Sequence, residues 1–523
     1  MGDQPFLAIL AFGVALLVPG VLSKRLNVPG PILLVPFGAI VGFLPALHGL
    51  HVQPEVVLNV FLPPLIYRAA FLTAPRESRQ DALPITILAV GLTSATALCV
   101  MVAVGFAVPG LPWAAALALG AAIAPTDPVA ATSVLQRVGA PRRLVTILEG
   151  ESLLNDGVAL TLFGLALSGL SGEVTVADGV IELLRVVCGG ILYGLAVAWV
   201  IGKVRRVFHD AGSQIVLSLL TPFVAYLPAE HFEVSGVLAT IVTGFVLGIS
   251  PQGVLQPASR LSGQVFWRVL SHLLESTLFV LLGVQIMDVF HEVRDLPWTQ
   301  LALTALVAMA VVIVLRLAWT ALVLAPVRLG RPIERRQRLV LGWAGMRGAI
   351  TLAIALSIPL DAPNRALLIF LAACVVLVTL GVQATTLAPV LRRLGVGEPQ
   401  EEVQEDATAR EALLEAALAR LDELAADDKV DDRTAEVFRQ LFELRLDRVR
   451  EVLGDLDGDG DGEGADADAG AESHHVGLRR ELIRAQRDKL RHLYRKGVIG
   501  ADTMRKLDHE LDVEERRRVS GGA

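Results

Sequence analysis

Residues 150–157, GESLLNDG, place a glutamate, a serine, an asparagine and an aspartate inside a stretch that otherwise reads as apolar helix, between LVTIL (144–148) and VALTLFGLAL (158–167). Ser152 and Asp156 are four residues apart, as are Glu151 and Asn155, so at about 100° per residue the four side chains share one side of a helix. A charged group at the centre of a bilayer is unfavourable by at least ~2.5–3.5 kcal/mol. If this helix spans a membrane, its polar side predicts an ion site, because its oxygens suit a hard cation.

The composition predicts a membrane protein. The chain has 523 residues, 53% of them apolar, and a mean hydropathy of +0.58, which is too hydrophobic for a soluble protein. Apolar stretches of roughly 17–25 residues can span a bilayer, and we expect about thirteen of them. Their approximate ranges are 6–22, 30–48, 55–73, 83–108, 113–136, 144–170, 178–205, 213–227, 234–250, 264–289, 299–325, 336–359 and 365–391.

Basic residues gather in alternate loops, among them Lys24 and Arg25 and the segment VRLGRPIERRQR (327–338). Because positive charge marks cytoplasmic loops, an odd number of spans places the amino terminus outside and the carboxy-terminal tail in the cytoplasm. The first apolar stretch is followed, not preceded, by positive charge, which favours a spanning helix over a cleaved signal peptide.

Charge divides the chain into two expected domains, a transmembrane domain at 1–397 and an acidic cytoplasmic helical tail at 398–523. Residues 401–523 hold 32 of the 53 acids and 21 of the 46 bases, which makes the tail strongly acidic and the remainder mildly basic. The tail contains three stretches with amphipathic helical spacing. Near 454–474 a Gly/Asp-rich segment predicts a disordered linker.

A second polar position lies in the fifth expected span, AAIAPTDPVAATS (121–133). Pro125 and Pro128 bracket Thr126 and Asp127, and prolines at this spacing predict a break in the helix. A broken helix at membrane depth is tolerated where it is buried in protein or faces a wet cavity, and its free backbone groups can bind ions. A lone Asn155 is more typical of helix–helix contact, but the clustering of these residues favours a cation site.

The motifs APTDPVAATSVL (124–135) and EGESLLNDGVAL (149–160) strongly resemble those of the monovalent cation:proton antiporters, the family of sodium/proton exchangers that includes bacterial antiporters of the NhaP type. FLPPLIY (61–67), HFEVSGVLA (231–239) and GWAGMRGAITLAIAL (342–356) also fit. The resemblance covers roughly residues 5–395. It implies an all-α polytopic fold of two inverted six-helix repeats with two broken crossing helices, assembled as a homodimer.

The resemblance also implies a role for each matching residue. Asp156 is the exchanged proton and cation carrier, and Asn155 lies beside it. Asp127 and Thr126 stand where the two broken helices cross, and Thr126 and Ser152 offer oxygens, so the expected cation ligands are Asp156, Asp127, Thr126 and Ser152. Glu151 pairs with Arg316 in VVIVLRLAW, and Arg347 belongs to the second broken helix, in the twelfth span.

The expected function is therefore secondary antiport of Na⁺, K⁺ or Li⁺ for H⁺ across the plasma or inner membrane. Proton and cation compete for Asp156, and with Asn155 in place of a second titrating acid we predict electroneutral one-for-one exchange by alternating access. Neither enzymatic activity, a cofactor nor a nucleic-acid partner is expected. Cys99, Cys188 and Cys374 show no paired or metal-type spacing and are expected to be reduced and buried.

Two alternative functions would use similar residues. An intramembrane aspartyl protease also needs two membrane aspartates, but its Gly-x-Gly-Asp run is absent, and a passive cation channel would need a pore or filter loop that the sequence does not suggest. The choice among Na⁺, K⁺ and Li⁺ is left open. One departure from the family is Arg68 in LIYRAA, where relatives commonly carry an acid; snorkelling toward the cytoplasm is the interpretation that we favour for it.

Overall fold

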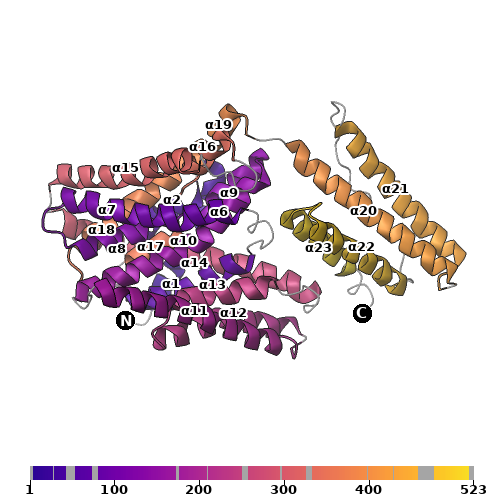
Figure 1. Ribbon diagram of the computed structural model, residues 1–523, viewed down its shortest axis with the longest axis horizontal. Helices are drawn as coiled ribbons and strands as arrows, with labels where there is room; N and C mark the ends of the chain where they lie inside the picture. Colours follow the sequence, from indigo (N-terminus) through magenta and orange to yellow (C-terminus); the bar gives the residue numbers. More distant parts are fainter. Residues whose placement is uncertain are drawn as a thin grey trace. The chain divides into compact units, whose positions relative to one another are not determined.

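The chain folds into helices, as the computed structural model shows (Figure 1). The structure describes residues 4–26, 29–42, 53–72, 81–171, 176–208, 210–249, 257–294, 297–324, 333–396, 399–427, 429–456 and 476–516. Within these ranges every regular element is helical, which confirms the all-α prediction.

The first half of the membrane part contains α1 (Gln4–Leu26), α2 (Gly30–Gly42), α3 (Pro54–Val56), η1 (Val57–Phe61), α4 (Leu62–Leu72), α6 (Ala82–Thr86), η2 (Ile87–Leu92), α7 (Thr93–Ala107), α8 (Trp113–Ile123), α9 (Pro128–Val138) and α10 (Arg142–Ser171). The second half contains α11 (Val176–Val204), α12 (Ala211–His231), α13 (Gly236–Ile249), α14 (Pro257–Val293), α15 (Trp298–Leu322), α16 (Arg335–Trp343), α17 (Ala349–Leu356), α18 (Arg365–Val378), η4 (Thr379–Gln383) and α19 (Ala384–Leu394). The η elements are wider turns within longer helices.

Eight of the described helices are long and apolar enough to cross a membrane: Ala82–Ala107, Trp113–Val138, Arg142–Leu170, Arg185–Val204, Ala211–His231, Ser262–Ile286, Trp298–Leu322 and Arg365–Leu394. Gly13–Ser23, Gly30–Gly42 and Gly236–Ile249 are shorter apolar helices. The protein is thus a multi-pass membrane protein by helix length and composition. The count of thirteen spans and the inverted repeats stay predictions.

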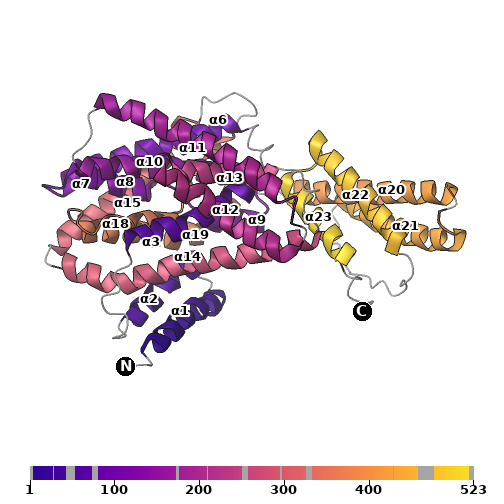
Figure 2. The same cartoon turned by 90° about the horizontal axis from the view of Figure 1, so that it is seen from below.

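Helix α8 packs against α7, α10, α17 and α18, and Figure 2 shows it beside α7 and α10. Its sequence, WAAALALGAAI, is alanine-rich, and every residue from Ala114 to Ile123 is buried. Small side chains let neighbouring helices approach closely. At Gly120 an added Cβ would meet the backbone of Ala97 on α7, so this packing requires glycine and fixes α8 at the site.

Contacts divide the chain into two compact units, Met1–Val254 with Gly263–Gly397 and Glu398–Ala523 with Leu255–Ser262. The second unit contains α20 (Pro399–Ala426), α21 (Asp432–Leu456), α22 (Val476–Lys496) and α23 (Ala501–Arg516), which pack through two apolar clusters. Residues 454–456 of the expected linker end α21, and its remainder lies outside the described residues.

The expected burial of the cysteines was wrong for two of them. Cys99 and Cys188 are exposed on their helices and Cys374 is half-buried, all three as free thiols. An apolar span contributes thiols to its outer face as readily as to its core, because the bilayer is as apolar as the protein interior.

Candidate functional site

The first broken helix is interrupted between Ile123, where α8 ends, and Pro128, where α9 begins. Pro128 occupies the first turn of α9, where its missing N–H removes no hydrogen bond. Asp127 is the N-cap of α9, and its Oδ1 accepts a hydrogen bond from Val129 N at 2.9 Å. The break therefore holds one carboxylate at a helix N-terminus, where the helix dipole favours negative charge.

The second broken helix is interrupted between Trp343 and Ala349, and it meets the first one directly. The backbone N–H of Asp127 donates to the carbonyl of Met346 at 2.8 Å. The guanidinium of Arg347 donates from Nε to the carbonyl of Ile123 at 2.9 Å and also bonds the carbonyl of Gly345. A buried cation thus satisfies the end of α8, where the dipole is negative.

Glycine is required where the two breaks touch. A Cβ at Gly348 would collide with the side chain of Asp127, and one at Gly345 would collide with the guanidinium of Arg316. The close approach of the breaks therefore depends on the missing side chains of the GMRG sequence.

The polar side of α10 faces the first break. Glu151, Ser152, Asn155 and Asp156 are all buried. Thr126 joins three of them: its carbonyl accepts from Ser152 Oγ at 2.9 Å, its Oγ1 accepts from Asn155 Nδ2 at 2.9 Å, and its Oγ1 donates to Glu151 Oε1 at 3.2 Å. The face that helical spacing predicted is present, and Thr126 is its common partner.

Glu151 and Arg316 form a buried ion pair between α10 and α15. Arg316 Nη2 donates to Glu151 Oε2 at 2.9 Å, Nη1 bonds Oε1, and Nε donates to the carbonyl of Leu341 at 3.1 Å. The two side chains are 2% and 1% exposed. All of the carboxylate's charge is compensated locally, so Glu151 is a poor ligand for a further cation.

Two oxygens of the same face have no partner. Asn155 Oδ1 and Asp156 Oδ1 are buried without a hydrogen bond, although Asn155 is fully buried and Asp156 is 2% exposed. Buried polar atoms normally have a hydrogen-bond partner, and an unpartnered one indicates another interaction, such as binding of an ion. The hydroxyls of Thr126 and Ser152 both donate elsewhere, which leaves acceptor lone pairs on them. Oxygens of this kind fit a hard monovalent cation.

Sequence reasoning missed one acid close to this site. Glu275, on α14, forms an ion pair with Arg68 of α4 at 3.9 Å. Arg68 thus has an acidic partner, and its snorkelling stays a prediction. The signal was available, because Glu275 is a carboxylate inside the apolar stretch HLLESTLFVLLG (272–283), and such a residue is a functional candidate by default.

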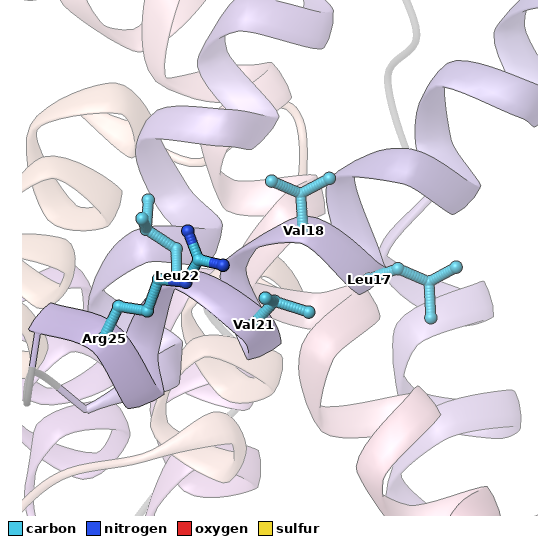
Figure 3. Close-up of a pocket in the computed structure, with 5 residues that line it drawn as sticks. All are labelled: Leu17, Val18, Val21, Leu22 and Arg25. Carbon is cyan, nitrogen blue, oxygen red and sulfur yellow. The ribbon is translucent and has the colours of Figure 1, made fainter.

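A groove on α1 is separate from the site (Figure 3). It is lined by Leu17, Val18, Val21, Leu22 and Arg25. Its lining is apolar apart from one guanidinium, and it contains none of the polar residues described above. This groove therefore offers no oxygen ligand for a cation.

A family model described as sodium/hydrogen exchanger, transmembrane, matches residues 12–393. An uncharacterised Na⁺/H⁺ exchanger of Mycobacterium tuberculosis is 33% identical over 97% of this chain and 95% of its own length. A sodium, potassium, lithium and rubidium/H⁺ antiporter of Bacillus pumilus is 31% identical over 74% of this chain and 61% of its own length. The solved structure of the sodium proton antiporter MjNhaP1 from Methanocaldococcus jannaschii at pH 8 shares the fold, with a TM-score of 0.61 and 21% identity over 76% of this chain and the whole of that one.

Proposed function

This chain belongs to the sodium/hydrogen exchanger family, and from that premise we propose that it exchanges Na⁺, K⁺ or Li⁺ for H⁺ one for one through Asp156. The observation that supports this most is the pair of unpartnered buried oxygens, Asn155 Oδ1 and Asp156 Oδ1, facing the break at Thr126 and Asp127. The transported cation would be held by Asp156, Asp127, Thr126 and Ser152. The names of relatives, one of which includes potassium and lithium, keep the choice of cation open.

The mechanism follows from burial of the Asp156 carboxylate. A carboxylate removed from water is unstable as a free anion and binds either a proton or a cation. Each of the two neutralises it, and only the neutralised site passes between inward-facing and outward-facing states. Because the proton and the cation exclude each other on one carboxylate, the concentration gradient of one ion drives the transport of the other.

Electroneutral exchange follows from the residue beside the carrier. Asn155 carries no titrating proton, and its amide Nδ2 is held by Thr126 Oγ1. Asp127 caps α9, and we assign it to holding the cation while Asp156 exchanges the proton. One neutralising ligand therefore crosses in each direction, and turnover moves no net charge.

The surrounding assignments complete the proposal. Residues 1–397 form the exchange domain and 398–523 a cytoplasmic tail, with the amino terminus outside. The unit acts as a homodimer in the plasma or inner membrane. The Glu151–Arg316 pair and Arg347 hold the crossing of the broken helices and do not bind the cation.

The test uses purified protein in proteoliposomes loaded with a pH-sensitive dye, with Na⁺, K⁺ and Li⁺ added in turn. We expect cation-dependent proton movement whose rate is unchanged when a membrane voltage is imposed, and we expect Asp156→Asn to abolish it. Current that scales with turnover would refute electroneutrality, and substantial exchange by Asp156→Asn would show that the carrier is another residue. Cation flux that needs no proton counter-flow would favour a channel, and peptide cleavage by the purified protein would favour a protease.

A further inference from the structure

Arg68 and Glu275 are a pair of opposite charges inside the membrane unit that the exchange mechanism above does not use. Arg68 lies on α4 and Glu275 on α14, with Nη1 and Oε1 3.9 Å apart and side chains 28% and 29% exposed. Charged groups within a spanning region face the protein interior or a wet cavity, because lipid does not solvate them. The pair therefore lies beside water or a polar path.

The two helices also touch through aromatic rings, since Tyr67 directly precedes Arg68 on α4 and Trp267 lies about two turns before Glu275 on α14. The rings of Tyr67 and Trp267 are 5.4 Å apart, and Trp267 Nε1 donates to Ser218 Oγ at 2.9 Å. The hydroxyl of Tyr67 accepts from Arg205 Nη2 at 3.1 Å. Because Trp267 and Glu275 are eight residues apart on α14, they lie on about the same side of that helix. The contact between α4 and α14 thus includes these two rings as well as the ion pair.

Electrostatic interactions connect this pair with the cation site. The carboxylate of Asp127 interacts with the charge of Arg68 and with that of Glu275. Ser271, one helical turn before Glu275 on α14, is 1% exposed and its Oγ has no hydrogen-bond partner. This buried hydroxyl without a partner adds one more polar group on α14 within a helical turn of Glu275.

The geometry argues against a purely structural role. At 3.9 Å the pair is beyond hydrogen-bond distance, and a loose, partly exposed pair of this kind stabilises a fold only weakly. The Glu151–Arg316 pair, by contrast, is buried and bidentate. In the loose pair, Arg68 can therefore exchange Glu275 for another acidic partner.

We propose that Arg68 is a tethered competitor of the transported cation and that Glu275 holds its guanidinium away from Asp127. With Glu275 present, Arg68 is retained at the side of the site and a cation can reach Asp127. Without Glu275, the guanidinium is free to move toward Asp127 and take the place of the cation. Arg68 and Glu275 are in this sense positioning residues that set the cation affinity.

The inference rests on the proposed exchange at Asp156, and its test is the dependence of exchange rate on Na⁺ concentration at one fixed pH. Arg68→Gln removes the competitor and should lower the KM for Na⁺ by about 2–5-fold, whereas Glu275→Gln releases it and should raise the KM by about 3–10-fold. The double variant should have the KM of Arg68→Gln, because Glu275 has nothing to restrain once Arg68 is absent. Arg68→Lys keeps the charge and should retain a KM near that of the wild type.

A matched control is Arg143→Gln, which breaks the 2.6 Å pair between Arg143 and Asp81 elsewhere in the same unit and should leave the KM unchanged. The amount of each variant in the membrane is measured alongside the rates. If Arg68→Gln and Glu275→Gln move the KM in the same direction, or change only the maximal rate, the proposal is overturned. Failure of the wild type to exchange, or exchange by Asp156→Asn, would instead overturn the proposed function.

Discussion

Replacing Glu151 by glutamine tests whether the buried pair with Arg316 locks the crossing helices. Glutamine keeps the shape of the side chain and an oxygen that can accept from Thr126 Oγ1, so the main loss is the negative charge. Arg316 is 2% exposed and would be left as an uncompensated buried cation, which destabilises a protein by about 3–5 kcal/mol.

The measurement is unfolding of the purified protein by titration with SDS in mixed micelles, followed by circular dichroism. Glu151→Gln should lower the free energy of unfolding by about 3–5 kcal/mol. The double variant Glu151→Gln, Arg316→Met removes both charges and should be more stable than Glu151→Gln alone, because no buried charge is left unpaired. A loss below about 1 kcal/mol in the single variant, or losses that simply add in the double variant, would contradict the lock.

Three further predictions concern the site and the tail. Asn155→Asp places a second titrating acid beside Asp156 and should make exchange sensitive to voltage, measured as current on a supported membrane; unchanged voltage independence would argue against the role given to Asn155. Gly348→Ala directs a Cβ at the Asp127 side chain and should lower the exchange rate about 10–100-fold, whereas Gly105→Ala, with nothing within 4 Å, should not; equal rates in the two would contradict the close contact. Arg487→Gln removes bonds to Asp508 and Asp512 and should destabilise the tail by about 1–3 kcal/mol, seen as faster limited proteolysis of the full chain. Arg484→Gln, whose arginine side chain is 69% exposed in its pair with Glu481, should match the wild type.

The parts of the site that the sequence predicted are those controlled by local chemistry. Helical spacing alone places Glu151, Ser152, Asn155 and Asp156 on one side of α10. Two prolines three residues apart are sufficient to break the fifth expected span into α8 and α9. These features depend on residues within a few turns of each other. The first broken helix could therefore be predicted from local residues, whereas the second, at Arg347, was implied only by the resemblance to the family.

Long-range hydrogen bonds were not accessible in the same way. Which oxygens of α10 stay free depends on Thr126, and the role of Arg347 depends on the carbonyl of Ile123, far away in the chain. No spacing rule connects such positions. Glu275 was missed for a related reason, because its significance comes from Arg68 and Asp127 on other helices.

The two charged pairs of the membrane unit differ in what a conformational cycle can do to them. Hydrogen bonds link the break between α8 and α9 to α10 and α15 through Thr126, Glu151 and Arg316, and dissociating the last two would leave both charges buried and unpaired. In the proposed alternating-access cycle these helices must then move together. Arg68 and Glu275 instead lie on α4 and α14, where Tyr67 and Trp267 are also in contact, and their charges interact with Asp127. Because the Arg68–Glu275 pair is loose and the Glu151–Arg316 pair is buried and bidentate, variants of the loose pair should alter the KM and variants of the tight pair should alter stability.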